Sequence, residues 1–253
     1  MQTNLKTIPA PLFYSVTFTG ILLILLSGCE KDKNIRNPFS DKAPIVFNKK
    51  LVYGTMTDQD GNTYKTIEIG TQTWMAENLR TTRYRNGDSI PNKITLHQWS
   101  TGWTDMCWSY DNDSSYSLIY GRLYSWFCIR DERNISPSGW HVPTMDEWKI
   151  LVTFLGGKNI AGGKLKEEGT AHWQGPNNGA TNESGFTALP AGAHGDPDRA
   201  FDDGGCIGYF WSSTLILEPM YQANGWGLQN DQKQFDSLAF QLDLGFSVRC
   251  IKD

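Results

Sequence analysis

The amino-acid sequence predicts an α+β fold built from short strands, a few short helices and long ordered loops. Three observations predict it. Glycine (25 residues) and tryptophan (10 residues) are frequent while helical periodicity is scarce, which favours short strands and loops with buried aromatic rings. A strong hairpin turn, Asp60-Gly61, precedes an alternating segment. A capping box formed by Thr144 and Glu147 begins the clearest amphipathic helix in the chain.

The first 28 residues have the pattern of a secretory signal peptide. Lys6 is the only charge before an apolar run that starts at Pro11, and the densest part of this run reads GILLILLSGC. The run is too short for a comfortable membrane span. The four residues that end at Cys29 (LSGC) resemble the lipobox of bacterial lipoproteins. We therefore expect a lipoprotein signal peptide over residues 1–28 and lipidation of Cys29. The alternative is an ordinary secretory leader with an incidental cysteine.

Residues 29–51 are charged, polar and broken by Pro38 and Pro44, which predicts a tether between the lipid anchor and the domain. The acid–base mixture after Cys29 resembles the surface-export tags of Bacteroidota-type lipoproteins. The expected location is therefore the cell envelope, lipid-anchored in the outer membrane and exposed at the surface. Residues 52–253 suit one domain of ordinary size. A net charge of −4 and the lack of a basic run argue against a nucleic-acid partner.

The N-terminal part of this domain is predicted to be a β-meander. After the Asp60-Gly61 turn, Ile67 and Ile69 fall on an extended segment, residues 70–72 form a second turn, and Trp74 begins the next strand.

A short helix is predicted next within residues 118–130 (LIYGRLYSWFCIR). Its apolar residues share one face despite Gly121, and they are Ile119, Leu123, Trp126 and Phe127. Residues 161–173 (AGGKLKEEGTAHW) offer one more helical turn. Three later segments read as strands: GFTALPAG (185–192), GYFWSST (208–214) and LAFQLDLGFSVRC (238–250), the last bent at Gly245.

The segment SGWHVPTMDEW (138–148) gathers residue types that are common in active sites, but a structural role explains them. Thr144 and Glu147 form a T-x-x-E capping box, and Pro143 keeps Val142 extended ahead of it. Apolar residues then recur at helical spacing until a glycine pair ends the helix: Trp148, Leu151, Val152, Leu155, then Gly156-Gly157. We interpret His141 as a core or second-layer residue.

Several motifs occur in a fixed order: IGTQTWMAENL, YGRLYSW, GWHVPTMDEW, AGGKLKE, GATNESGFTALPAG, GYFWSST and FSVRC. Together they resemble the Fibrobacter succinogenes major paralogous domain (FISUMP) family over residues 52–253. A looser similarity, through YSWF, HVPTMDEW and FSVRC, links the chain to the C-type-lectin-like fold and its formylglycine-generating-enzyme-like branch. The resemblance implies a C-type-lectin-like fold with small twisted antiparallel sheets, two main helices and long ordered loops.

Four cysteines remain in the domain, and an oxidising compartment would allow up to two disulfides in three connectivities. They are Cys107, Cys128, Cys206 and Cys250. None lies in a CxxC or CxxH spacing, so zinc has no support. Members of the resembled family commonly carry a cysteine where this chain has Ser136. The resemblance leaves open whether Cys128 replaces that cysteine as the partner of Cys250.

The sequence shows no recognisable catalytic constellation. An oxidase similar to the formylglycine-generating enzymes needs a thiol pair in the late loops, where Cys206 stands alone. No G-x-S-x-G elbow presents a nucleophile. Asp146 and Glu147 cannot act as a glycosidase pair, because neighbours on a helix point in different directions. We expect no catalysis. The alternative is an envelope enzyme that acts through Cys206 or an unrecognised carboxylate pair.

Two acid-rich segments, residues 111–115 and 195–205, are the candidates for metal binding. Neither follows the EF-hand pattern, and solvated turns explain their composition. We expect no cofactor, with calcium as the alternative.

Ligand binding is predicted in the loops between residues 175 and 231. They are long and glycine-rich, and binding groups are often carried by loops on a rigid scaffold. Aromatic rings in such loops can stack on sugars or peptides, and carboxylates can accept hydrogen bonds from hydroxyls. The candidates are Tyr221, Trp226, the outlying Trp173, Asp196, Asp198, Asp202 and Asp203. We expect non-catalytic binding of carbohydrate or another surface polymer. The second alternative is a structural or protein-interaction module.

Overall fold

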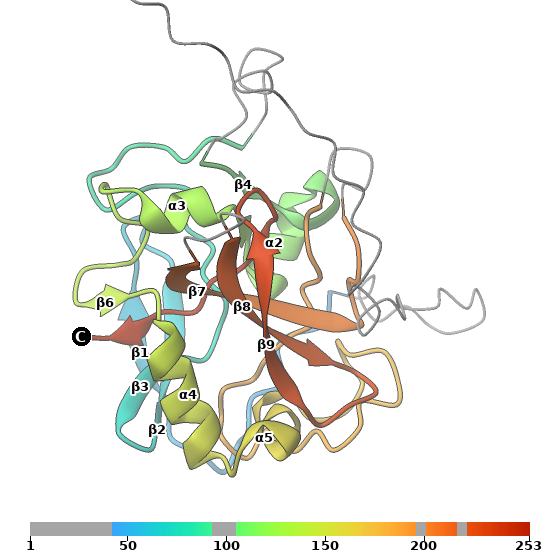
Figure 1. Ribbon diagram of the computed structural model, residues 1–253. Helices are drawn as coiled ribbons and strands as arrows, with labels where there is room; N and C mark the ends of the chain where they lie inside the picture. Colours follow the sequence, from blue (N-terminus) through green and yellow to red (C-terminus); the bar gives the residue numbers. More distant parts are fainter. Residues whose placement is uncertain (1–41, 93–104, 196–200, 217–221) are drawn as a thin grey trace, which may run out of the picture. The chain divides into compact units, whose positions relative to one another are not determined.

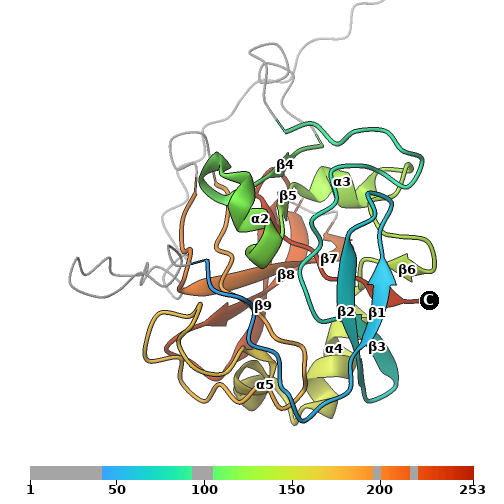
Figure 2. The ribbon, with the colours of Figure 1, turned by 180° about the vertical axis from the view of Figure 1, so that it is seen from behind.

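The computed structural model describes residues 42–92, 105–195, 201–216 and 222–253, which form two sheets and several short helices (Figure 1). One sheet has five strands in the order β1-β2-β3-β11-β6, and the other has six in the order β4-β5-β10-β7-β8-β9. Figure 2 shows the same elements from behind. The α+β class predicted from the sequence is confirmed.

The five-stranded sheet is antiparallel throughout and contains the predicted meander. Its strands are β1 (Gly54–Thr57), β2 (Thr63–Ile69), β3 (Gln72–Met75), β6 (Trp140–His141) and β11 (Ile251–Lys252). Gly61 adopts a φ of 81° between β1 and β2, which is the left-handed conformation that the predicted turn requires. The C-terminal strand β11 lies between β3 and β6 and pairs with both.

The six-stranded sheet is mixed, because β10 pairs in parallel with β7 while its other pairs are antiparallel. Its strands are β4 (Cys107–Trp108), β5 (Leu123–Tyr124), β7 (Ile207–Ile216), β8 (Gln222–Gln229), β9 (Phe235–Gln241) and β10 (Phe246–Ser247). The predicted strand at residues 185–192 is instead loop with isolated bridges, such as the one between Gly192 and Gly208.

The strongest helix prediction is confirmed. The helices are α2 (Ser114–Tyr120), α3 (Trp126–Arg130), α4 (Met145–Phe154) and α5 (Lys158–Leu165), with a 3₁₀ turn at Tyr110–Asn112. At the start of α4, the Thr144 hydroxyl accepts a hydrogen bond from Glu147 N, and the Glu147 carboxylate accepts one from Thr144 N at 2.8 Å. Both halves of the capping box are therefore present.

The single helix predicted within residues 118–130 is wrong. The chain there forms the end of α2, the strand β5 and the helix α3. Gly121 separates them with a φ of 73°, and a Cβ at that position would lie only 2.5 Å from the Asn78 Cβ. The apolar spacing was correct for burial, but the close approach of another backbone segment at Gly121 prevents a continuous helix.

The main core surrounds Trp148 of α4, whose ring centroid lies 4.7 Å from that of Trp74 and 5.6 Å from that of Phe235. Phe186 and Phe210 complete the ring cluster. Aromatic residues thus join both sheets to α4, as the composition suggested.

Two buried cations hold the late loops in place. Arg249 donates to Asn78 Oδ1 and to the carbonyls of Met75, Phe186 and Thr187, and burial lowers the pKa of its guanidinium to about 9. Lys166 donates to carbonyls that include Gln229 O at 2.9 Å, and burial lowers its pKa to about 8. These charges satisfy carbonyls of the loop at Phe186 and Thr187 and carbonyls at the ends of β3 and β8.

Residues 42–51 pack on the domain, so the tether predicted over residues 29–51 extends too far. Ala43 O accepts a hydrogen bond from His172 Nε2 at 2.8 Å, and Val46 N donates to Glu167 Oε1 at 2.6 Å. His172 and Glu167 are fully buried and lie 2.7 Å apart (Nδ1 to Oε2). We call residues 42–48 the strap; it is blue in Figure 2. No helix among the described residues is long and apolar enough to cross a membrane.

Candidate functional site

The two tryptophans predicted to bind ligand are core residues, and this part of the prediction is wrong. Trp173 is fully buried and donates from Nε1 to Ala188 O at 2.9 Å. Trp226 is 4% exposed, and its ring centroid lies 4.7 Å from that of Phe235. Trp226 belongs to β8, where Gly225 leaves room for the ring of Phe240. The glycines beside Trp226 suggested a loop, but they lie in a strand, where the missing side chain of Gly225 makes room for a neighbouring ring.

Three of the other candidates, Tyr221, Asp196 and Asp198, lie outside the described residues. Asp202 is exposed, and its backbone pairs with that of Ala193. Asp203 is half-buried and accepts a hydrogen bond from Tyr209 OH at 2.9 Å. The structure therefore retains Asp202 as an accessible carboxylate and gives Asp203 a contact within the domain.

Partly buried rings lie beside these two aspartates. The ring centroid of Phe201 is 5.1 Å from that of Tyr110 and 4.9 Å from that of His194. Tyr110 OH accepts a hydrogen bond from Gly204 N at 3.2 Å. The ring centroid of Tyr116 lies 6.1 Å from that of Tyr110. We call the half-buried side chains of Tyr110, Tyr116, His194 and Phe201 the aromatic face.

The aromatic face has a rigid base. The imidazole of His194 stacks on Trp108 with centroids 4.0 Å apart and planes 8° from parallel. Burial lowers the pKa of His194 to about 4, so this ring is neutral at physiological pH. Asp111 and Asp113 are exposed on the adjoining turn, and Lys42 of the strap forms an ion pair with Asp113 at 3.0 Å. The face therefore combines rings with carboxylates of accessible loops.

The SGWHVPTMDEW segment forms a structural contact between α4 and the C-terminal end of the chain. His141 Nδ1 lies 2.7 Å from Asp253 Oδ1, and its Nε2 lies 2.8 Å from Glu147 Oε1. Burial opposes protonation, but the hydrogen bonds to both carboxylates outweigh it and raise the pKa of His141. Glu147 is at the same time the capping residue of Thr144. Its carboxylate is therefore committed to the helix cap and to His141.

None of the pairings open to the four domain cysteines is present in the structure. Cys107, Cys128 and Cys250 are buried free thiols, which leaves no pair among the four. Cys128 Sγ contacts Met106 O at 3.2 Å, while Cys250 contacts the Ser136 side chain. Burial raises the pKa of Cys107 to about 11 and that of Cys250 to about 12, so neither is an activated nucleophile. Cys206 is also buried. Among the described residues, no His, Cys, Asp and Glu groups converge as a metal site.

Sequence reasoning missed a polar surface cavity of about 580 Å³. Its lining residues are Arg85, Asn86, Glu132, Arg133 and Asn134. They come from two loops, residues 81–88 and residues 131–136, that are held together by Arg85 N donating to Asn134 O at 2.8 Å. These residues follow no sequence motif, and the contact between the two loops, 49 positions apart at these two residues, is visible only in the fold. We call this feature the polar cavity.

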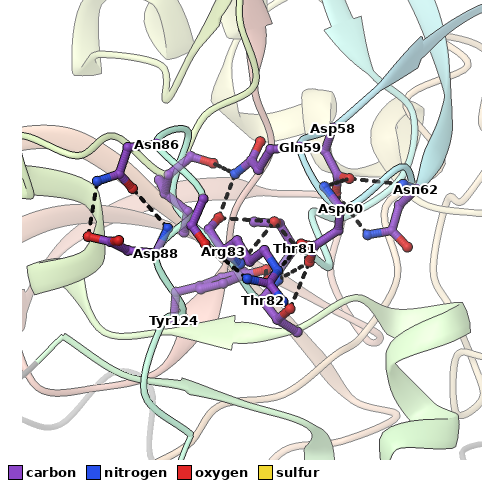
Figure 3. Close-up of polar contacts among 12 residues, drawn as sticks. Asp58, Gln59, Asp60, Asn62, Thr81, Thr82, Arg83, Asn86, Asp88 and Tyr124 are labelled. Atoms are coloured by element: carbon purple, nitrogen blue, oxygen red, sulfur yellow. Dashed lines mark hydrogen bonds and ion pairs between the residues drawn. The ribbon is translucent and has the colours of Figure 1, made fainter.

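The turn between β1 and β2 fixes both walls of the polar cavity (Figure 3). Asp60 Oδ2 accepts hydrogen bonds from Thr82 N at 2.6 Å and from Thr82 Oγ1 at 2.8 Å. Gln59 Nε2 donates to Arg83 O at 2.6 Å and to Ile135 O at 3.1 Å, one carbonyl on each loop. Asp58, in the same turn, accepts hydrogen bonds from four donors within residues 60–64. The acidic turn is therefore a structural support.

The fold and these surfaces define a mixed α+β domain with an aromatic face and a polar cavity on its surface. Residues 67–252 match the family described as the Fibrobacter succinogenes major domain, and this chain belongs to that family. The family resemblance of the sequence motifs is thereby confirmed. Comparisons with curated proteins and with solved structures found no match. The C-type-lectin-like assignment accordingly stays a prediction.

Proposed function

We propose that the chain is a cell-envelope lipoprotein, anchored through Cys29 in the outer membrane, whose domain binds carbohydrate or another surface polymer without catalysis. The observation that carries the binding proposal is the aromatic face. Its rings are half-buried and come from two loops, the 3₁₀ turn and α2, and Asp111 and Asp202 are exposed beside them. Rings that stack on apolar sugar faces, flanked by carboxylates that accept hydroxyl hydrogen bonds, suit a saccharide.

The surroundings of the aromatic face favour a preformed binding surface. Trp108 is 7% exposed and supports His194 by stacking, while Tyr110 is held by Gly204 and by the Phe201 ring. A rigid scaffold lowers the conformational entropy that binding costs. Each stacked ring contributes about 0.5–1.5 kcal/mol beyond its buried area, so single sites are weak. Many anchored copies on one surface would raise the avidity.

A glycan array probed with the chain, with Cys29 and the preceding leader removed, tests this proposal. Once a saccharide binds, Phe201→Ala should weaken it about threefold to tenfold, which corresponds to one lost stacking contact. Asp202→Asn should weaken it by a similar factor because an amide is a poorer acceptor than a carboxylate. Phe154→Ala removes an exposed ring of α4 outside the aromatic face and is the matched control. Equal losses in all three variants, or no binding to any saccharide, would contradict the proposal.

A further inference from the structure

The polar cavity contains two opposite charges that have no ion-pair partner in the part of the chain that the structure describes. Within the described residues, neither Arg85 nor Glu132 forms an ion pair. Both side chains are exposed at the cavity. A preformed site with one unmatched cation and one unmatched anion is complementary to a ligand that carries both charges.

The guanidinium of Arg85 is held in a fixed orientation. Nε donates to Ser136 O at 3.0 Å, and Nη2 donates to Pro137 O at 2.9 Å and to Trp140 O at 3.1 Å. These carbonyls occupy one edge of the guanidinium and leave Nη1, which has two N–H groups, available to a ligand. A cation whose rotamer is fixed by backbone contacts loses little entropy when it binds a carboxylate.

The second arginine of the cavity behaves differently. Arg133 is paired with Asp131 at 2.7 Å and with Asp105 at 2.8 Å, and its guanidinium lies 4.1 Å from the centroid of the Tyr84 ring. Asp88 adds a third carboxylate at 3.6 Å. Arg133 is therefore already compensated, and its three carboxylate partners leave a net negative charge around it. A net negative charge beside the cavity opposes a simple anion but favours a ligand whose carboxylate is accompanied by an ammonium group.

We propose that the polar cavity binds a zwitterion, with its carboxylate at Arg85 Nη1 and its ammonium group at Glu132, as in a free amino acid or a short peptide with both termini unblocked. Asn86 and Asn134 line the same cavity and supply further polar groups. The volume of about 580 Å³ falls in the range of ligand pockets, which is roughly 300–1,000 Å³. This site shares no residue with the aromatic face, so it goes beyond the proposed function.

Calorimetric titration of the full-length chain with three matched ligands tests the proposal: alanyl-alanine, its N-acetyl form and its C-terminal amide. Alanyl-alanine should bind, and each blocked form should bind about tenfold or more weakly because it loses one charge-assisted contact. Free alanine, titrated alongside, distinguishes the two sources of the zwitterion. Tighter binding of alanine indicates a free amino acid, and tighter binding of the dipeptide indicates a peptide; either result supports the site.

Glu132→Gln is the decisive variant, because this side chain is exposed and forms no ion pair with any described residue. It should abolish the penalty for N-acetylation and keep the penalty for amidation. Arg85→Gln should do the reverse. Glu168→Gln, an exposed glutamate elsewhere, is the control and should keep both penalties. The proposal is overturned if the three ligands bind equally, if none binds, or if Glu132→Gln retains the acetylation penalty.

Discussion

At the scale of single residues, Ser136 shows how one substitution changes the chemistry of a buried contact. The resembled family commonly has a cysteine at this position, and the structure places the Ser136 side chain against Cys250. Cys128 does not replace the missing partner, since its thiol contacts Ser125 and Met106 O instead. The question that the sequence left open is thereby answered: Cys250 remains a free thiol.

Replacing Ser136 by cysteine should therefore create a disulfide with Cys250 under oxidising conditions. Closing so long a loop restricts the unfolded chain, and a gain of about 2–4 kcal/mol in the free energy of unfolding is expected. Thermal denaturation with and without reductant measures it, and a thiol count should fall by one relative to the wild type. The same substitution at Ser114, an exposed position on α2, is the control for adding a thiol elsewhere. A Ser136→Cys protein whose melting temperature is unaffected by reductant would contradict the expected pairing.

Tryptophans mark the limit of what residue-level reasoning could predict. Trp148 was assigned to the core because it follows helical spacing behind a cap, and it is fully buried. Trp226 has glycines on both sides and looked like a loop residue, yet it lies in β8. The residues around a glycine do not indicate which aromatic ring, distant in sequence, will pack against it in the fold. The local sequence does not predict the cavity of Arg85 and Glu132 for the same reason, because only tertiary contact brings their two loops together.

At the scale of elements, α4 is the helix that the sequence predicts best, because its cap, its apolar stripe and its ending are all local. Thr144→Ala removes the hydroxyl that accepts a hydrogen bond from Glu147 N, and should lower the free energy of unfolding by about 1 kcal/mol. Thr153→Ala, at an exposed position inside α4, should be neutral or slightly stabilising because alanine has the higher helix propensity. Chemical denaturation of both variants gives the comparison. Equal effects of the two substitutions would show that the cap is dispensable.

The strap is an element that local patterns did not predict, since its prolines and charges suggested a tether. Its attachment depends on the proton of His172. Nε2 faces the Ala43 carbonyl and Nδ1 faces the Glu167 carboxylate, so both nitrogens must carry a proton for both contacts to be hydrogen bonds. Burial opposes this charge, but the hydrogen bond and the charge of Glu167 outweigh it and raise the pKa of His172.

A raised pKa in the folded state makes the stability of the strap depend on pH. The stabilisation from His172 is fully present below the pKa of the unfolded chain, about 6.5, and is lost as the pH rises through the higher folded value. Unfolding free energies measured from pH 5.5 to 9 should fall more steeply in the wild type than in His172→Gln. The variant also keeps His141, whose pKa is raised as well, so the difference between the two curves isolates His172. Parallel curves would contradict the proposed protonation.

At the scale of the whole molecule, the two candidate surfaces lie on a domain for which we propose a membrane attachment through Cys29, a residue outside the described part of the chain. Residues 30–41 connect Cys29 to the strap along the chain. Twelve residues span at most roughly 43 Å when fully extended. If Cys29 is the proposed lipid anchor, a ligand held by the aromatic face is expected close to the membrane surface, which suits a polymer of that surface.

This arrangement depends on the lipidation of Cys29, which the LSGC sequence predicts. Intact-mass spectrometry of the mature protein should show cleavage before Cys29 and the added mass of a diacylglyceryl group. Cys29→Ser should prevent this modification and leave the leader uncleaved, because the lipid is attached to the thiol. Cys128→Ser removes a buried cysteine of the domain and should leave processing unchanged. An unmodified Cys29 in the mature protein, or cleavage at another site, would rule out the lipoprotein and leave the ordinary secretory leader as the explanation of residues 1–28. Several acyl chains hold a protein on a membrane far more firmly than one. The lipid-modified wild type should therefore stay with the membrane fraction after washing in high salt. Any membrane association that remains in Cys29→Ser must come from contacts other than the lipid.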